Sequence, residues 1–272
     1  MPVQFERKQK YDVGDLITIM SLLRGEGGCP WDREQDHHSI RRNFIEETYE
    51  VCEAIDNDDP VLLQEELGDV LLQVAFHARM EEEAGRFDFG DVCDGICKKL
   101  IVRHPHVFGE TKVADSGEVL VNWDRIKERT KGQKTATETL RSVSAALPAL
   151  MRSEKVQHRA AKVGFDYPDT GGALRDLESE VAELREAISE GDAAHIDEEL
   201  GDVLFAAVNV SRFTHVDAEQ SLGQACEKFI DRFEQVEALA RERGVDMKTA
   251  GIEKLDELWK QAKKRNAAKP TD

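Results

Sequence analysis

The sequence is poor in the residues that build many-stranded β structures. Aromatic residues make up 6% of the 272 residues, and there are only seven prolines. Sandwiches and barrels need many short strands rich in aromatic residues and bounded by turns, so this composition disfavours them. The charged content of 34% instead fits long helices with a solvent-exposed face. The length suits one large domain or two ordinary ones.

Signals for membranes, disulfides and nucleic acid are missing as well. No apolar run approaches the length of a membrane span, and the start MPVQFERKQK lacks the apolar core of a signal peptide. The five cysteines lack CxxC spacing, which favours buried thiols in a reducing compartment. A formal net charge of −18 disfavours nucleic acid polymers and anionic membranes as partners. We expect a cytoplasmic protein that binds phosphates only if metal ions bridge the two.

Helical periodicity is what the chain has in abundance. Breakers such as GEGGCP, DNDDP and VGFDYPDTGG separate the periodic segments. The polar segment Lys131–Thr137 is the best boundary, and it predicts two domains, 1–131 and 138–266. The expected helices are Asp12–Arg24, Ser39–Ile55, Pro60–Ala84, Phe89–Arg103, Glu118–Lys131, Leu147–Ala161, Gly172–Ser189, Ala193–Thr214, Ala218–Arg243 and Ile252–Asn266.

The heptapeptide EELGDVL occurs twice, at Glu65–Leu71 and Glu198–Leu204, 133 residues apart. The same offset aligns an ExxE motif in each half. Slightly smaller or larger offsets align later residues, including two basic residues and a tryptophan. These patterns indicate duplication of one helical module. The aligned pairs are Glu47 with Glu180, Glu50 with Glu183, Glu66 with Glu199, Asp69 with Asp202, Arg79 with Arg212, Lys99 with Lys228, Arg103 with Arg232 and Trp123 with Trp259.

The repeated acids have the spacing of a helical hairpin. Residues three apart share one face of a helix, so ExxE and ExxD each point two carboxylates at one target. Residue 58, in the DNDDP turn, is midway both between Glu50 and Glu66 and between Glu47 and Asp69. An antiparallel hairpin folded there brings the four acids level, roughly 12 Å from the turn. In the second half the midpoint is residue 191, a glycine.

Four clustered carboxylates repel one another unless a cation joins them. An all-oxygen set suits a hard divalent ion, Mg²⁺ first and Mn²⁺ second. The alternative for a single such motif in an acidic chain is a solvated helix face. Two hairpins with the same acids, spacing and turn position favour the metal site. Gly68 and Gly201 lie mid-helix, where glycine is costly, so we expect another helix or a ligand to approach closely there.

Several ordered motifs make the chain resemble the MazG family of nucleoside triphosphate pyrophosphohydrolases. The first half carries GCPWDREQ, EELGD and KKLIVRHPHVFGE, and the second carries EELGDVLFAAVN, EKFIDRF and ELWKQAK. The resemblance implies an all-α fold of tandem MazG-type helical-bundle domains that assembles as a homodimer. It also implies Mg²⁺-dependent hydrolysis of NTPs and dNTPs to NMP and pyrophosphate, in housecleaning or control of the nucleotide pool.

The resemblance also assigns roles to individual residues. It implies that water attacks the α-phosphorus while an outer carboxylate takes the proton. Where the second half has the family's substrate-side asparagine, the first has Phe76, which weakens the case for the N-terminal site. The implied catalytic and metal-ligating residues are Glu180, Glu183, Glu199 and Asp202, with Glu47, Glu50, Glu66 and Asp69 as N-terminal metal ligands. The implied substrate-binding residues are Asn209, Lys228, Arg232, Trp259, Lys263, Lys99 and Arg103.

Other readings of the sequence stay open. No GxxxxGK[ST] P-loop is present, which excludes a motor-type NTPase. A narrower dUTP, dCTP or phosphoribosyl-ATP pyrophosphohydrolase is one alternative, although such enzymes usually carry a single module. A non-catalytic helical dimer that binds nucleotide or metal is the other. Trp259 fits a base-stacking residue and a core tryptophan equally well.

Overall fold

The computed structural model describes residues 4–113, 115–119, 122–123, 126 and 135–267. The regular structure of these residues is helical, which confirms the expected all-α class. The chain divides into two compact units, Met1–Thr130 and Lys131–Asp272. No helix in the described residues is long and apolar enough to cross a membrane.

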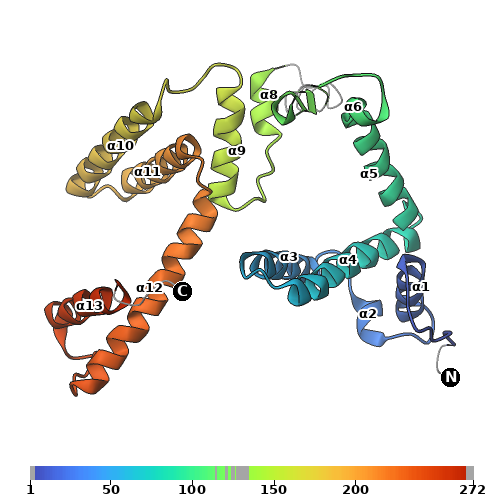
Figure 1. Cartoon of the computed structure of the whole chain (residues 1–272), viewed down its shortest axis with the longest axis horizontal. Helices are drawn as coiled ribbons and strands as arrows, with labels where there is room; N and C mark the ends of the chain where they lie inside the picture. The colour runs from blue at the N-terminus through green and yellow to red at the C-terminus, as the bar shows by residue number, and fades with distance from the viewer. Residues whose placement is uncertain (1–3, 114, 120–121, 124–125, 127–134, 268–272) are drawn as a thin grey trace. The chain divides into compact units, whose positions relative to one another are not determined.

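The first unit is built around one long antiparallel hairpin (Figure 1). The hairpin packs α3 (Arg41–Asp56) against α4 (Pro60–Glu83), and α1 (Val13–Arg24) and α5 (Phe89–Arg103) also contact α4. Two short helices, α2 (Pro30–Glu34) and α6 (Pro105–Phe108), follow α1 and α5. The buried core of α1 and α4 consists of Met20, Ile40, Ala75, Phe76 and Met80.

The second unit repeats the hairpin and adds a second helix pair (Figure 1). The hairpin packs α10 (Thr170–Glu190) against α11 (Ala193–Thr214), and α9 (Ala149–Ala161) packs on α11. The short helix α8 (Ala136–Arg141) contacts α9. The second pair is α12 (Ala218–Glu242) with α13 (Gly251–Ala267), whose core is Val236, Leu239, Ala240, Leu258 and Ala262.

Both hairpins turn at the residues that the spacing of the acids predicts, 58 and 191. Asp58 has φ 52° and Gly191 has φ 75°, so the left-handed turn residues are themselves 133 positions apart. Asp59 and Asp192 follow them and cap the next helix, each accepting a backbone N–H bond with its side chain. The hairpins of the two units therefore share one register, and this fixes the level of the acids.

Some expectations were incomplete or wrong. Most of the helix expected at Glu118–Lys131 falls outside the described residues, as does the start of the expected linker Lys131–Thr137. The end of that linker is not a loop, because α8 begins at Ala136. Of the two partners expected at Gly68 and Gly201, the described structure shows no other helix close by, and approach of a ligand stays a prediction. A Cβ added at either glycine meets no atom within 4 Å.

Candidate active site

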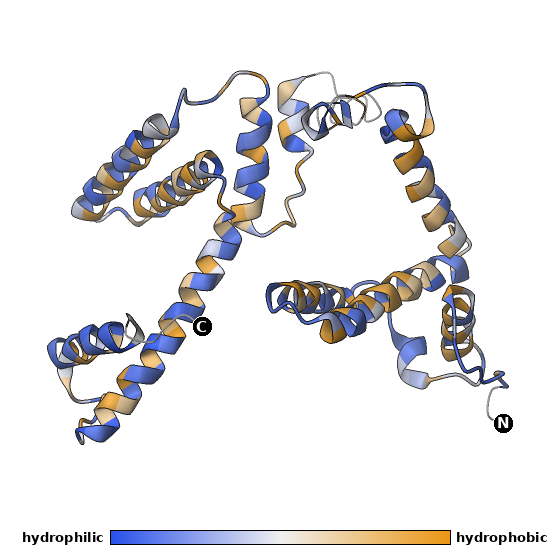
Figure 2. Cartoon of the chain, viewed as in Figure 1, coloured by the Kyte–Doolittle hydropathy of each residue, from blue (hydrophilic) through white to orange (hydrophobic). Residues whose placement is uncertain are grey.

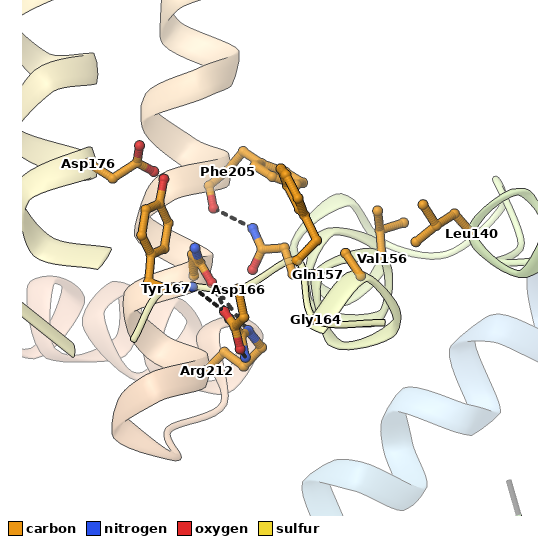
Figure 3. A pocket seen from close by; sticks show the side chains of 12 residues that line it. Leu140, Val156, Gln157, Gly164, Asp166, Tyr167, Asp176, Phe205 and Arg212 are labelled. Atoms are coloured by element: carbon orange, nitrogen blue, oxygen red, sulfur yellow. Dashed lines mark hydrogen bonds and ion pairs between the residues drawn. The ribbon is translucent and has the colours of Figure 1, made fainter. Parts of the chain in front are cut away.

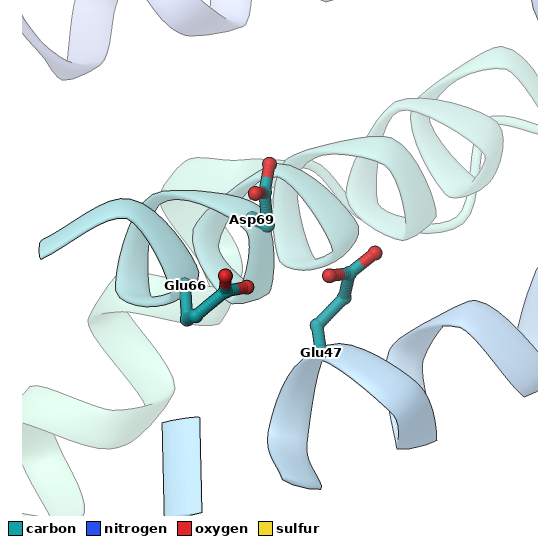
Figure 4. A group of neighbouring side chains, drawn as sticks. All are labelled: Glu47, Glu66 and Asp69. Atoms are coloured by element: carbon teal, nitrogen blue, oxygen red, sulfur yellow. The ribbon is translucent and has the colours of Figure 1, made fainter. Parts of the chain in front are cut away.

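Three acids of the first hairpin converge on one point. Glu47 lies on α3, and Glu66 and Asp69 lie one turn apart on α4, facing it (Figure 4). One carboxylate oxygen from each lies within 4.8 Å of the others. Glu66 is buried, and the other two are half-buried. This is the all-oxygen arrangement that the spacing of the repeated acids predicts.

The second hairpin makes the same group with the equivalent residues. Oxygens of Glu180 on α10 and of Glu199 and Asp202 on α11 also lie within 4.8 Å of one another. Glu199 is buried, and within the described structure its Oε2 atom has no hydrogen-bond partner. A buried carboxylate oxygen without a partner is costly, so this atom is a ready ligand for a cation.

The fourth predicted acid of each set, Glu50 or Glu183, is not part of the group of three, but its charge affects the pKa values of that group. Burial raises the pKa of Glu47, and the charges of Asp69 and Glu50 raise it further. Burial also raises the pKa of Glu66, with Glu50 as the largest charge contribution. Glu50 therefore acts on both helices of its hairpin. These raised pKa values are what like charges without a cation produce.

In the second unit, Glu183 has the corresponding place. Burial raises the pKa of Glu180, and Glu183 is the first charge to add to the effect. Glu183 is exposed, and its Oε1 accepts a hydrogen bond from Ser179 Oγ at 3.0 Å. The exposed position leaves Glu183 free to turn toward a ligand at the group of three.

A histidine that sequence reasoning missed lies beside the second acid group. His195 Nε2 is 3.2 Å from Glu199 Oε1, and its Nδ1 is 3.2 Å from Glu190 Oε2. The hydrogen bond with Glu190 is the main cause of the raised pKa of His195, and Glu199 adds to it. Because His195 is one turn before Glu199 on α11, helical spacing could have revealed the pair.

A cavity of about 460 Å³ is lined by residues of α9, α10 and α11 and of the segment between α9 and α10 (Figure 3). Its lining includes Phe205 and Asn209 from α11, one and two turns after Asp202, and Asp176 from α10, one turn before Glu180. Tyr167 donates a hydrogen bond to Asp176, which with burial raises the pKa of Tyr167 to about 12. The phenol is therefore neutral at ordinary pH.

Asn209 is held in one orientation at the wall of this cavity. Its Oδ1 accepts hydrogen bonds from Arg212 Nη2 at 2.8 Å and Nε at 3.2 Å. Arg212 is itself fixed by an ion pair with Asp166 that lowers the Asp166 pKa. The predicted substrate-side asparagine thus lies in a cavity beside the acids and offers its Nδ2 amide hydrogens.

In the first unit, Arg24 and Phe76 are in contact at the equivalent place. Phe76 replaces the asparagine and is buried in the core. The guanidinium of Arg24 lies 5.3 Å from the centre of the Phe76 ring, and Arg24 Nη2 is 2.9 Å from Glu83 Oε2. The departure seen in the sequence therefore has a structural counterpart. An ion-paired arginine packs over an aromatic ring where the second unit has an open cavity.

The structure does not bring the predicted basic residues to the acids. Lys228 is exposed and Arg232 is half-buried on α12, which packs mainly against α13. The described residues show no ion pair between these two and either acid group. In the first unit Lys99 is exposed, and the Arg103 guanidinium lies 5.2 Å from the Trp123 ring centre.

Trp259 lies in a helix interface. It packs against the core between α12 and α13, with its ring centre 5.0 Å from that of Phe229. Lys263, one turn later on α13, is exposed. This geometry favours the core interpretation of the tryptophan over the stacking one.

Comparison with known proteins decides the family. The model of the MazG nucleotide pyrophosphohydrolase domain matches residues 35–108 and 172–237. The chain belongs to the MazG nucleotide pyrophosphohydrolase family. Each matched region contains one acidic hairpin, so the MazG domain is present twice. The chain is accordingly an enzyme, and the non-catalytic alternative is wrong.

Two relatives match the MazG chain along most of its length. The "Nucleoside triphosphate pyrophosphohydrolase" of Escherichia coli K12 is 44% identical over 92% of this chain and 96% of its own length. The "Nucleoside triphosphate pyrophosphohydrolase/pyrophosphatase MazG" of Thermotoga maritima is 43% identical over 92% of this chain and 94% of its own length. The match to both relatives covers the two repeats together.

Proposed function

We propose that this MazG protein hydrolyses nucleoside and deoxynucleoside triphosphates to NMP and pyrophosphate with Mg²⁺, in control of the nucleotide pool. The observation that carries the proposal is the second acid group, Glu180, Glu199 and Asp202, with an open cavity beside it. The names of the two long relatives support the same substrate class. The narrower dUTP, dCTP or phosphoribosyl-ATP activity remains a second candidate, and the tandem repeat counts against it.

The acid groups fit a hard divalent cation. All donors are carboxylate oxygens, three converge within 4.8 Å, and Glu199 Oε2 is buried without a partner. This chemistry suits Mg²⁺, with Mn²⁺ as an alternative, and it does not suit zinc, which prefers nitrogen and sulfur ligands. Glu180, Glu199 and Asp202 would hold the ion, with Glu183 turning in from α10. The bound ion supplies positive charge that lets a triphosphate approach carboxylates.

The residues of the chain then orient the substrate and handle the proton. The cavity beside Asn209 and Phe205 holds the nucleoside end, so the triphosphate lies over the acids. Water attacks the α-phosphorus, and an outer carboxylate, Glu180 or Asp202, takes its proton as general base. Lys228 and Arg232 remain predicted partners of the leaving pyrophosphate, as Trp259 and Lys263 remain predicted nucleotide contacts.

Product analysis tests this function directly. We expect purified protein to release NMP and pyrophosphate from the eight common NTPs and dNTPs in Mg²⁺, and to stop when EDTA is added. The Glu199→Gln variant is the matched control, because it keeps the size of the buried side chain and removes its charge. Release of NDP and orthophosphate would contradict attack at the α-phosphorus. Turnover of a single nucleotide alone would favour the narrower enzyme.

We also propose that the domains 1–131 and 138–266 act within a homodimer in the cytoplasm. Hydrophobic residues occur along α5 and α12 (Figure 2). Several of them are exposed in the single chain, including Ile96 (44%), Phe229 (56%) and Ile230 (57%). Helical bundles bury such faces against further helices, which a second copy can supply. Sedimentation equilibrium at micromolar concentration should give twice the chain mass, and a monomer would contradict the proposal.

A further inference from the structure

A buried glutamine in the second unit forms a hydrogen bond with one of its two side-chain polar atoms, and the other has no hydrogen-bond partner in the described structure. Gln157 lies on α9 and is only 6% exposed. Its Nε2 donates a hydrogen bond to the main-chain oxygen of Phe205 on α11 at 2.7 Å. Its Oε1 is buried and has no hydrogen-bond partner within the described structure. Buried polar atoms are paired in most proteins, so an unpaired one calls for a ligand or another explanation.

The orientation of this amide follows from its partner. A main-chain carbonyl can only accept, so the end of Gln157 that faces Phe205 must be the amino group. Oε1 is therefore held as an acceptor by a bond between two helices. Because no described group of the chain donates to Oε1, this acceptor can take a hydrogen from a ligand.

Gln157 is one of the residues that line a cavity with both polar and apolar walls. The cavity of about 460 Å³ is lined by Gln157, Asn209 and the aromatic rings of Phe205 and Tyr167 (Figure 3). Because Arg212 occupies Oδ1 of Asn209, that side chain presents hydrogen donors. The cavity thus combines a hydrogen-bond acceptor, a hydrogen-bond donor and apolar ring surfaces. Small-molecule sites use this combination to bind a ligand and fix its orientation.

The cavity is within one helical turn of the acids that would hold the triphosphate. Phe205 follows Asp202 by three residues on α11, and Asp176 precedes Glu180 by four on α10. Residues three or four apart on a helix share a face. A nucleotide with its phosphates at the acids therefore extends its nucleoside end into this cavity.

We propose that the cavity takes the nucleobase and that Gln157 Oε1 accepts a hydrogen bond from an N–H on the base edge. The inference rests on the proposed function and identifies the nucleobase as the part of the substrate that Gln157 contacts. Adenine, guanine, cytosine, uracil and thymine all carry an N–H next to an acceptor atom on their pairing edge. One acceptor and one donor on the protein therefore suit all five bases and reject rings that lack the N–H.

The first repeat has other residues at the positions of Gln157 and Asn209. Gln157 corresponds, at the offset of 133, to Arg24, and Asn209 corresponds to Phe76. Arg24 hydrogen bonds with Glu83 and lies over Phe76. The acceptor and the donor are thus both replaced, and their replacements contact each other. We infer that base recognition belongs to the second unit.

The test compares ATP with purine riboside triphosphate, which lacks the exocyclic N–H. For the unaltered protein, kcat/KM should be about tenfold higher for ATP, as expected for one hydrogen bond to a buried acceptor. In Gln157→Leu, kcat/KM for ATP should fall about tenfold through KM, and the preference over the analogue should fall to about one. The Ki of tripolyphosphate, which has no base, should change less than twofold.

The controls separate this inference from the function on which it rests. Gln64→Leu, at an exposed glutamine of α4, should keep the preference for ATP. Equal kcat/KM values for ATP and the analogue in the unaltered protein would overturn the inference, and this measurement needs no variant to fold. A Gln157→Leu protein that keeps the preference would overturn it too. If no triphosphate yields pyrophosphate, the proposed function itself fails.

Discussion

At the scale of single residues, the candidate site consists of carboxylates that lie close to one another without an ion-paired lysine or arginine in the described structure. Burial and like charges raise the pKa values of Glu47, Glu66 and Glu180. Glu81 shows the opposite case in the same fold. Hydrogen bonds from Arg86 and His37 lower its pKa to about 2, so it is a paired, structural carboxylate. The contrast distinguishes clustered acids, whose charged neighbours are other acids, from an acid that already has cationic partners.

We predict that Glu180→Gln stabilises the protein when divalent ions are removed. A raised folded-state pKa means that the folded protein binds the proton more tightly than the unfolded chain. In EDTA, stability should therefore fall as pH rises from the ordinary carboxylate pKa through the raised one. The variant lacks this carboxylate and so loses less stability as pH rises. Its Tm in EDTA at pH 7 should be roughly 1–3 °C higher than that of the unaltered protein.

Addition of Mg²⁺ should make the unaltered protein more stable than the Glu180→Gln variant. Binding to the folded state stabilises it, so Tm of the unaltered protein should rise with Mg²⁺ while that of Glu180→Gln rises less. Differential scanning fluorimetry across pH 5–8, with and without the ion, measures both effects. A variant less stable than the unaltered protein in EDTA would show that Glu180 has a structural partner.

At the scale of elements, each hairpin depends on a turn residue in the left-handed region. Gly191 has φ 75° and ends α10, and Asp58 has φ 52° at the equivalent position. Residues with a Cβ are strained there, although Asp and Asn tolerate it better than others. The two repeats thus use different residues for one backbone conformation.

We predict that Gly191→Ala lowers the free energy of unfolding by about 1 kcal/mol, while Gly191→Asp lowers it by clearly less. The order follows from the first repeat, which already has an aspartate in this conformation. Thermal midpoints of the three proteins measure the effect. An alanine variant as stable as the aspartate one would show that the turn relaxes without cost.

Helical periodicity was enough to predict the long elements. The bounds of α1, α5 and α11 were expected to within a residue, and the hairpin turns follow from the spacing of the acids. The short helices α2, α6 and α8 were missed because four to six residues show no period. The cavity was missed for a different reason. It depends on α9 packing on α11, a contact that no local pattern encodes.

At the scale of the whole molecule, two repeats with the same acids differ in what surrounds them. The second hairpin has a cavity with Gln157 and Asn209, and the first has Arg24 packed on Phe76. The first unit also carries a pair that the second lacks, since His37 Nδ1 lies 2.7 Å from His77 Nδ1. Duplication preserved the acid groups, while the residues next to them diverged.

We predict that the second unit carries most of the turnover. Asp202→Ala removes an acid from the group beside the open cavity, and the ion there is lost or misplaced. Its kcat/KM for ATP and dTTP should fall roughly ten- to a hundredfold, to the level that the first site alone supplies. Asp69→Ala alters the equivalent acid in the repeat that has Phe76 in place of the asparagine. It should keep much of the turnover, because loss of a polar substrate contact has already weakened that site by roughly ten- to a hundredfold.

The two alanine variants are matched, since each removes the same carboxylate from the same motif in a different repeat. Circular dichroism must show that both remain helical, and the double variant should be slower than Asp202→Ala alone, because it also loses the residual turnover of the first site. If Asp69→Ala is the silent protein, then the first hairpin is the working site. The ion-paired Arg24 would in that case have to move away from Phe76 to admit the nucleotide, and the open cavity of the second unit would need another ligand.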